Sequence, residues 1–154
     1  MTESNEQALS TVLAKAEALC SERRVRLTAQ RRRVFELVCR AGRPVGAYEI
    51  LDQVRRGGRA APPTVYRALD FLLEQGLVHK LETLHAYVGC THPGHPHSSQ
   101  FLICADCGGV TELDDETIAG SLRTAAADTG FQPQRPIVEV IGTCASCAEK
   151  PGND

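Results

Sequence analysis

Apolar residues recur at steps of three and four through the first eighty positions, which is the spacing of helices with one buried face. Glycines and prolines interrupt this pattern and divide it into segments. Thr28 is a residue type favoured at N-caps, and Pro62 has the fixed φ that suits a first helical turn. The pattern predicts four helices, one from about residue 9 to 23 and others over 28–41, 47–56 and 62–76.

The chain after the fourth helix changes to short strand-like runs over 77–81 and 85–89. Two such runs around a three-residue connection predict a hairpin. Three helices followed by a hairpin form a winged helix-turn-helix, in which the last helix enters a major groove of DNA. The sequence therefore predicts an N-terminal winged-helix domain.

The fourth predicted helix has Val65, Leu69 and Leu72 on one face, so Tyr66 and Arg67 turn outward, where they can reach base edges. Arginines between positions 23 and 33, including Arg31, are candidates for phosphate contacts. The alternative is that these residues have no role in DNA binding. Arginine runs are usually solvated helix faces, and stacked helices are common in proteins that never bind DNA.

Charge is distributed unevenly. Lys and Arg number 17 against 19 Asp and Glu, a net charge of -2, but residues 1–80 hold 14 basic and 9 acidic side chains and residues 81–154 hold 3 and 10. The basic half suits a polyanionic partner. This balance favours double-stranded DNA as the partner of the first half.

Two Cys-x-x-Cys pairs provide the strongest chemical signal, and they are Cys104 with Cys107 and Cys144 with Cys147. Two such pairs form a closed tetrahedral sulfur site typical of structural zinc. The 36 residues between the pairs accommodate a strand, a helix over about 115–129 and a strand over 137–141. We expect a small α/β domain whose thin core depends on zinc. A redox role for either pair is the alternative.

A second set of metal ligands comes from separate parts of the chain: His79, Cys90, His97 and Glu112. Its mixture of nitrogen, sulfur and oxygen fits zinc better than iron(II) or manganese(II). These residues meet only if the two halves fold towards each other, which predicts a regulatory zinc site and two zinc ions per chain. The alternative for each histidine is a surface or core side chain whose hydrogen bonds are satisfied, and the alternative for Glu112 is a solvated acid.

Other protein classes are disfavoured. No apolar run approaches the roughly 20 residues that span a bilayer, and the N-terminus does not resemble a signal peptide, so we expect a cytoplasmic protein without a membrane partner. The common hydrolase, deaminase and P-loop motifs are absent. We therefore expect no enzyme and no small-molecule substrate. A zinc-containing thiol oxidoreductase and a purely structural zinc module are the alternatives.

Four stretches resemble the ferric uptake regulator family, and within it the branch of zinc uptake regulators. They are the run from Arg26 to Arg31, the run from Pro62 to Lys80 and the two Cys-x-x-Cys pairs. The resemblance implies an α+β protein with a winged-helix DNA-binding domain over 1–84, a hinge over 85–97 and an α/β dimerisation domain over 98–154.

The resemblance also implies a homodimer that, with zinc bound, represses zinc uptake genes at palindromic operators. It makes Cys104, Cys107, Cys144 and Cys147 the structural zinc site and His79, Cys90, His97 and Glu112 the sensing site. Tyr48 and Thr64 join Tyr66, Arg67 and Arg31 as DNA contacts. An iron-, manganese- or peroxide-responsive repressor is the alternative within the family. Asp52 and Arg55 are expected to pair within one helix, or else between neighbouring dimers.

Overall fold

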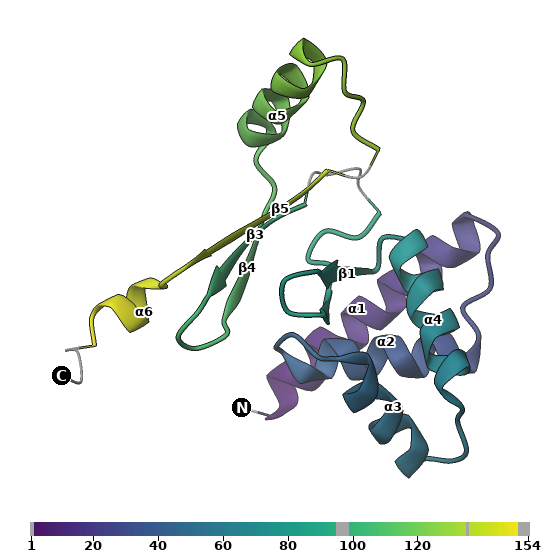
Figure 1. Cartoon of the computed structure of the whole chain (residues 1–154). Helices are drawn as coiled ribbons and strands as arrows, with labels where there is room; N and C mark the ends of the chain where they lie inside the picture. The colour runs from purple at the N-terminus through teal and green to yellow at the C-terminus, as the bar shows by residue number, and fades with distance from the viewer. Residues whose placement is uncertain (1, 95–98, 135, 151–154) are drawn as a thin grey trace. The chain divides into compact units, whose positions relative to one another are not determined.

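The structure is a computed structural model that describes residues 2–94, 99–134 and 136–150 (Figure 1). Contacts divide the chain into two compact units, Met1–His95 and Pro96–Asp154. Helices followed by a hairpin make up the first unit, and a small sheet with two helices makes up the second. The α+β class predicted from the sequence is confirmed.

The first unit contains all four predicted helices and the predicted hairpin. Thr28 caps the second helix, because its Oγ1 accepts a hydrogen bond from the Arg31 amide at 3.3 Å. Gly42 ends that helix with a φ of 60°, a left-handed conformation that glycine adopts without strain. The elements are α1 (Thr2–Glu22), α2 (Ala29–Ala41), α3 (Ala47–Arg56), α4 (Pro62–Glu74), β1 (Val78–Leu81) and β2 (Ala86–Gly89).

The core of the first unit is formed by the apolar faces of its helices and one side of the hairpin. Phe35, Ile50, Leu69 and Leu72 are almost inaccessible to solvent, and they come from α2, α3 and α4. Cys20 is buried among them, whereas Cys39 is only partly buried against this core. Packing of three helices around one core fixes which face of α4 points outward.

The hairpin is joined to the loop that precedes α3. Its strands pair antiparallel, with His79 opposite Val88. Val45 and Tyr87 then exchange two main-chain hydrogen bonds of 3.0 and 2.8 Å. The start of α3 is thereby tied to β2, which lies within the segment 85–97 that the sequence predicts as a hinge.

The second unit is a three-stranded sheet in the order β4-β3-β5, with β4 antiparallel and β5 parallel to β3. Its helix α5 begins after Asp115, whose Oδ1 accepts hydrogen bonds from the amides of Thr117 and Ile118. The predicted helix and the two predicted strands are confirmed. The elements are β3 (Ser99–Cys104), β4 (Val110–Leu113), α5 (Glu116–Asp128), β5 (Ile137–Gly142) and α6 (Ala145–Ala148).

The first strand of this sheet, β3, was not predicted from the sequence. A glutamine, Gln100, interrupts its apolar pattern, yet it is only 3% exposed. Its Oε1 accepts a hydrogen bond from the Asp115 amide at 2.9 Å, so the buried amide is satisfied by the residue that caps α5. This polar contact joins β3 to the start of α5.

The described part of the second unit has a thin core. Its buried apolar residues are Phe101, Ile103, Cys104 and Ala119. Other large apolar side chains remain accessible, among them Leu102 and Val140, which are neighbours in the register of β3 and β5. A unit with so little buried apolar surface depends on other sources of stability. In the described residues, no helix combines the length and the apolar character that a membrane span needs.

Candidate functional site

The four cysteines of the two Cys-x-x-Cys pairs converge at one end of the sheet in the second unit. Cys104 ends β3, and Cys107 follows in a turn. Cys144 immediately precedes α6, and Cys147 lies within it. The parallel register places Cys104 opposite Gly142, so the second pair arrives directly beside the first. All four sulfur atoms lie within 4.8 Å of one another.

Main-chain amides prepare these sulfur atoms for negative charge. The amide of Cys144 donates to the Sγ of Cys104 at 3.3 Å, and the amide of Gly109 donates to the Sγ of Cys107 at 3.4 Å. Hydrogen bonds from the main chain, above all from Cys144, lower the pKa of Cys104 to about 6. The side-chain hydrogen bond with Cys144 raises the pKa of Cys147 to about 12, so this thiol holds its proton until a metal displaces it.

The donor set fits one kind of metal site. Four converging sulfur ligands, two from each of two short turns, are the ligands of closed tetrahedral zinc sites. Such a site has no open position for a reacting water. A zinc ion there would join β3 to α6 and supply the stability that the thin core lacks.

Two of the predicted sensing residues lie side by side in the hairpin. His79 is half-buried on β1, and Cys90 is buried directly after β2. A ring nitrogen of His79 and the Sγ of Cys90 lie within 4.8 Å of each other. Glu112 lies on β4 of the second unit, and His97 lies outside the described residues. The hairpin therefore places one nitrogen and one sulfur atom, both capable of binding a metal, close together.

The exposed face of α4 carries the predicted DNA contacts. Tyr66 is 41% exposed and Arg67 is also exposed, while Val65, Leu69 and Leu72 are buried beneath them, as the sequence pattern predicted. Thr64 is half-buried in the first turn of the same helix.

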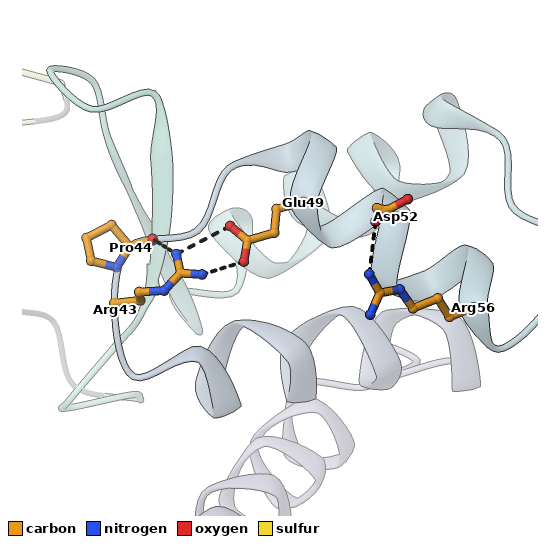
Figure 2. Close-up of polar contacts among 5 residues, drawn as sticks. All are labelled: Arg43, Pro44, Glu49, Asp52 and Arg56. Atoms are coloured by element: carbon orange, nitrogen blue, oxygen red, sulfur yellow. Dashed lines mark hydrogen bonds and ion pairs between the residues drawn. The ribbon is translucent and has the colours of Figure 1, made fainter.

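Tyr48 is a second exposed aromatic group, at the start of α3. Its side chain is 78% exposed, which is unusual for a tyrosine on a helix with a well-formed apolar face. The adjacent Glu49 is bound by Arg43, whose Nη2 donates to Oε1 at 2.5 Å and whose Nη1 donates to Oε2 at 3.3 Å and to the Pro44 carbonyl at 3.1 Å (Figure 2). This ion pair fastens the loop before α3 to the first turn of the helix.

The predicted pairing of Asp52 with Arg55 within one helix is wrong. Asp52 pairs with Arg56 one turn along α3, at 3.4 Å (Figure 2). Arg55 instead donates its Nε to the carbonyl of Ala60 at 3.1 Å. The i, i+4 spacing lets Arg56 reach the carboxylate, whereas Arg55 is drawn to the loop between α3 and α4.

Arg31 is held in place by two contacts that the sequence pattern did not indicate. Its guanidinium lies 3.9 Å from the centroid of the Phe71 ring on α4, and its Nη1 donates to the Arg26 carbonyl at 2.6 Å. A contact between residues 40 positions apart leaves no periodic signal in a sequence.

Comparisons with known proteins agree across the whole architecture. The sequence profile of the ferric uptake regulator family matches residues 22–141. The zinc uptake regulation protein of Escherichia coli (strain K12) is 45% identical over 140 residues, which cover 90% of this chain and 82% of that protein.

Solved structures of zinc uptake regulators match both units. A zinc uptake regulator complexed with zinc and DNA superposes with a TM-score of 0.87 at 44% identity, over 92% of this chain and 95% of that one. The crystal structure of holo XcZur gives a TM-score of 0.85 at 49% identity, over 91% of this chain and 99% of that one. With the winged helix, the four-cysteine cluster and the family profile in agreement, the chain belongs to the ferric uptake regulator family.

Proposed function

We propose that this chain is a zinc-responsive transcriptional repressor that acts in the cytoplasm as a homodimer and, with zinc bound, represses zinc uptake genes. The observation that carries the proposal is its similarity to a zinc uptake regulator complexed with zinc and DNA, which extends over 92% of the chain. A relative that matches both units of this chain supports one mechanism for both proteins.

Each chain binds two zinc ions in this proposal, and the first is structural. Cys104, Cys107, Cys144 and Cys147 hold it, and their convergence within 4.8 Å supports this. Structural zinc supplies on the order of 10 kcal/mol of apparent binding energy that is also folding energy. The second unit, with its small set of buried apolar residues, is the part of the chain that needs it.

The second ion is regulatory and is held by His79, Cys90, His97 and Glu112. The adjacency of His79 and Cys90 in the hairpin supports this assignment. Glu112 belongs to the other unit, so a metal bound by all four would stabilise only arrangements that bring the two units together around a hinge within 85–97. Zinc occupancy is thereby converted into domain geometry.

The DNA interface consists of Tyr48, Thr64, Tyr66, Arg67 and Arg31. The exposure of the Tyr66 and Arg67 side chains on α4 and of Tyr48 on α3 supports it. In a twofold dimer, two α4 helices would enter successive major grooves about 34 Å apart, which requires a palindromic operator.

The second unit provides the dimer surface. Val140 on the edge strand β5 is 50% exposed, and Leu102, its neighbour on β3, is 42% exposed. Exposed apolar side chains that cluster on a sheet are typical of protein interfaces. A second copy of the chain is the proposed occupant, because the same patch on two copies is self-complementary in a twofold dimer.

Metal-dependent DNA binding tests the proposal. The full-length protein is titrated onto promoter DNA of a zinc uptake gene with zinc, iron(II), manganese(II) or chelator, at two salt concentrations. We expect tight binding with zinc and weak binding with chelator. Activation by iron(II) without activation by zinc would assign the chain to the iron-responsive alternative, and disulfide reductase activity without DNA binding would assign it to the oxidoreductases.

Variants separate the two metal sites. Cys90→Ser is expected to abolish zinc-dependent DNA binding while leaving the helical circular dichroism unchanged. Cys39→Ser is the matched control, because Cys39 is outside both ligand sets. Equal zinc responses of the two variants would remove Cys90 from the sensing site.

A further inference from the structure

Three guanidinium groups from three segments of the first unit lie along one face of α4. Positions 67, 71 and 75 are one helical turn apart, with a rise of about 6 Å per step. Arg67 occupies the first position itself. The guanidinium of Arg31 covers the ring of Phe71, at 3.9 Å from its centroid. Nη1 of Arg23 donates to the carbonyl and to Oε1 of Gln75, at 2.8 and 3.2 Å.

Arg31 is fixed in its orientation before any partner binds. The Phe71 ring supports the flat face of the guanidinium, and the Arg26 carbonyl accepts from Nη1 at 2.6 Å. Within residues 2–94, 99–134 and 136–150, no acceptor bonds to its Nε or Nη2. These N–H groups are therefore available to an external acceptor. Because the side chain is already ordered, binding through it loses little conformational entropy.

The neighbouring arginines on α2 are held differently. Arg32 pairs with Glu17, and Arg40 pairs with Glu36 at 3.0 Å, so a carboxylate offsets each positive charge. The groups that hold Arg31 and Arg23 are carbonyls, a side-chain amide and an aromatic ring, all of them neutral. Arg31 and Arg23 keep their full positive charge, next to the helix that carries Arg67.

We infer that Arg31 and Arg23 form a preorganised phosphate-binding ladder beside Arg67, with Phe71 and Gln75 as the positioning residues. The inference rests on the proposed DNA binding and deepens it. Arg67, near the start of α4, contacts base edges, while the two following guanidinium groups bind backbone phosphates of the same operator. Phosphate contacts of this kind fix the register of a recognition helix without reading sequence.

The test uses the full-length, zinc-loaded protein and two duplexes. One duplex is selected from a random-sequence pool by the wild-type protein, and the other is a scrambled sequence of the same length and composition. The variants are Arg31→Lys, which keeps the charge but loses the planar group, and Phe71→Leu, which removes the ring. Arg40→Lys and Phe35→Leu are the controls. Arg40 is ion-paired, and in the described residues Phe35 is a buried ring without a guanidinium on it.

Arg31→Lys and Phe71→Leu are each expected to weaken binding by up to about tenfold, by the same factor on both duplexes. The double variant should bind DNA as tightly as Arg31→Lys alone, because the two substitutions remove the same contact. Arg31→Gln removes the charge, so the slope of log K for DNA binding against log salt concentration should become shallower by about 1 for each chain. The controls should leave the affinity of the folded protein unchanged.

Two results would overturn the ladder. The first is that folded Phe71→Leu and Arg31→Lys both bind DNA as tightly as the wild-type protein. The other is a loss confined to the selected duplex, which would mean that Phe71 acts through Arg67 and base contacts. Failure of the wild-type protein to select any duplex in zinc contradicts the proposed function instead, so the two failures are distinguishable.

Discussion

The amide of Cys144 donates a hydrogen bond to the Sγ of Cys104, across 40 residues of sequence. This bond lies at the end of the parallel pairing between β3 and β5, where Cys104 faces Gly142. This hydrogen bond contributes most to lowering the pKa of Cys104 to about 6. The sheet and the metal site are therefore interdependent: strand pairing prepares the thiolate, and a bound metal would hold the strands together.

Replacing Cys144 by serine is expected to unfold the second unit. The substitution removes one of four ligands, and metal-binding energy on the order of 10 kcal/mol is folding energy in such sites. Hydrogen exchange followed by mass spectrometry should show loss of protection in β3, β5 and α5 and preserved protection in α2 and α4. Cys20→Ala removes one sulfur atom from the core of the first unit and should leave protection in β3, β5 and α5 unchanged. Unchanged protection in β3 would contradict a structural role for the site.

The thiol of Cys39 makes stability depend on alkaline pH. Burial raises its pKa from 9.0 to about 12. Below pH 9 both folded and unfolded chains keep the proton, and the stabilisation is fully present. Between about pH 9 and about pH 12 only the unfolded chain ionises, so the free energy of unfolding falls. Urea unfolding of the wild type and of Cys39→Ala should show a steeper decline for the wild type. If the free energies of unfolding of the two proteins declined in parallel with pH, the raised pKa of Cys39 would be contradicted.

The cap of α2 is expected to contribute about 1 kcal/mol. Thr28→Ala removes the Oγ1 that accepts from the Arg31 amide, and it leaves an orphan donor in the first turn. Denaturant unfolding should report the loss. Thr11→Ala is a suitable comparison, because Thr11 is in the exposed middle of α1 and alanine is a better helix former there. Equal effects of the two substitutions would argue against a capping role.

The ion pair between Arg43 and Glu49 should stabilise the start of α3 only weakly. Both side chains are exposed, and exposed ion pairs contribute little to stability and are screened by salt. Glu49→Gln should therefore lower the free energy of unfolding at low salt and have little effect at high salt. Asp52→Asn, which breaks a single i, i+4 contact with Arg56, should cost about 0.3–0.5 kcal/mol. A loss that persists at high salt would point to packing rather than charge.

The exposed residues of β5 predict a substitution that prevents dimerisation. Val140→Glu places a carboxylate in the apolar surface formed with Leu102, where burial against a second copy would be unfavourable. Sedimentation should show a monomer, and DNA affinity should fall because one recognition helix is lost from each complex. Thr11→Glu, exposed in the first unit, should remain dimeric. A dimer of Val140→Glu would place the interface elsewhere.

Periodicity was sufficient for the first unit and insufficient for part of the second. The helices around Phe35, Ile50 and Leu69 bury regular faces, and regular faces are visible in a sequence. Strand β3 was missed because Gln100 is buried through a hydrogen bond that only the fold supplies. The α6 turn was also missed, since four residues are too few for a periodic signal.

The candidate sites were predictable to different degrees. The cysteine spacing alone indicated the sulfur cluster, because two Cys-x-x-Cys pairs have few other uses. The supports of Arg31 and Arg23 were not predictable, since Phe71 and Gln75 are distant in sequence and no local rule selects them. Asp52 pairs with Arg56 because Arg55 donates to the carbonyl of Ala60 in the following loop, and this too has no local signal in the sequence.

The bridge between Val45 and Tyr87 makes the hairpin and the start of α3 a single mechanical body. Cys90 follows this hairpin directly, and its amide bonds to the carbonyl of Leu77, so the proposed sensing ligand is attached to the same body as Tyr48. A metal bound at His79 and Cys90 would then leave the shape of the DNA-reading surface unaltered. It would change the orientation of this rigid surface and not its internal structure.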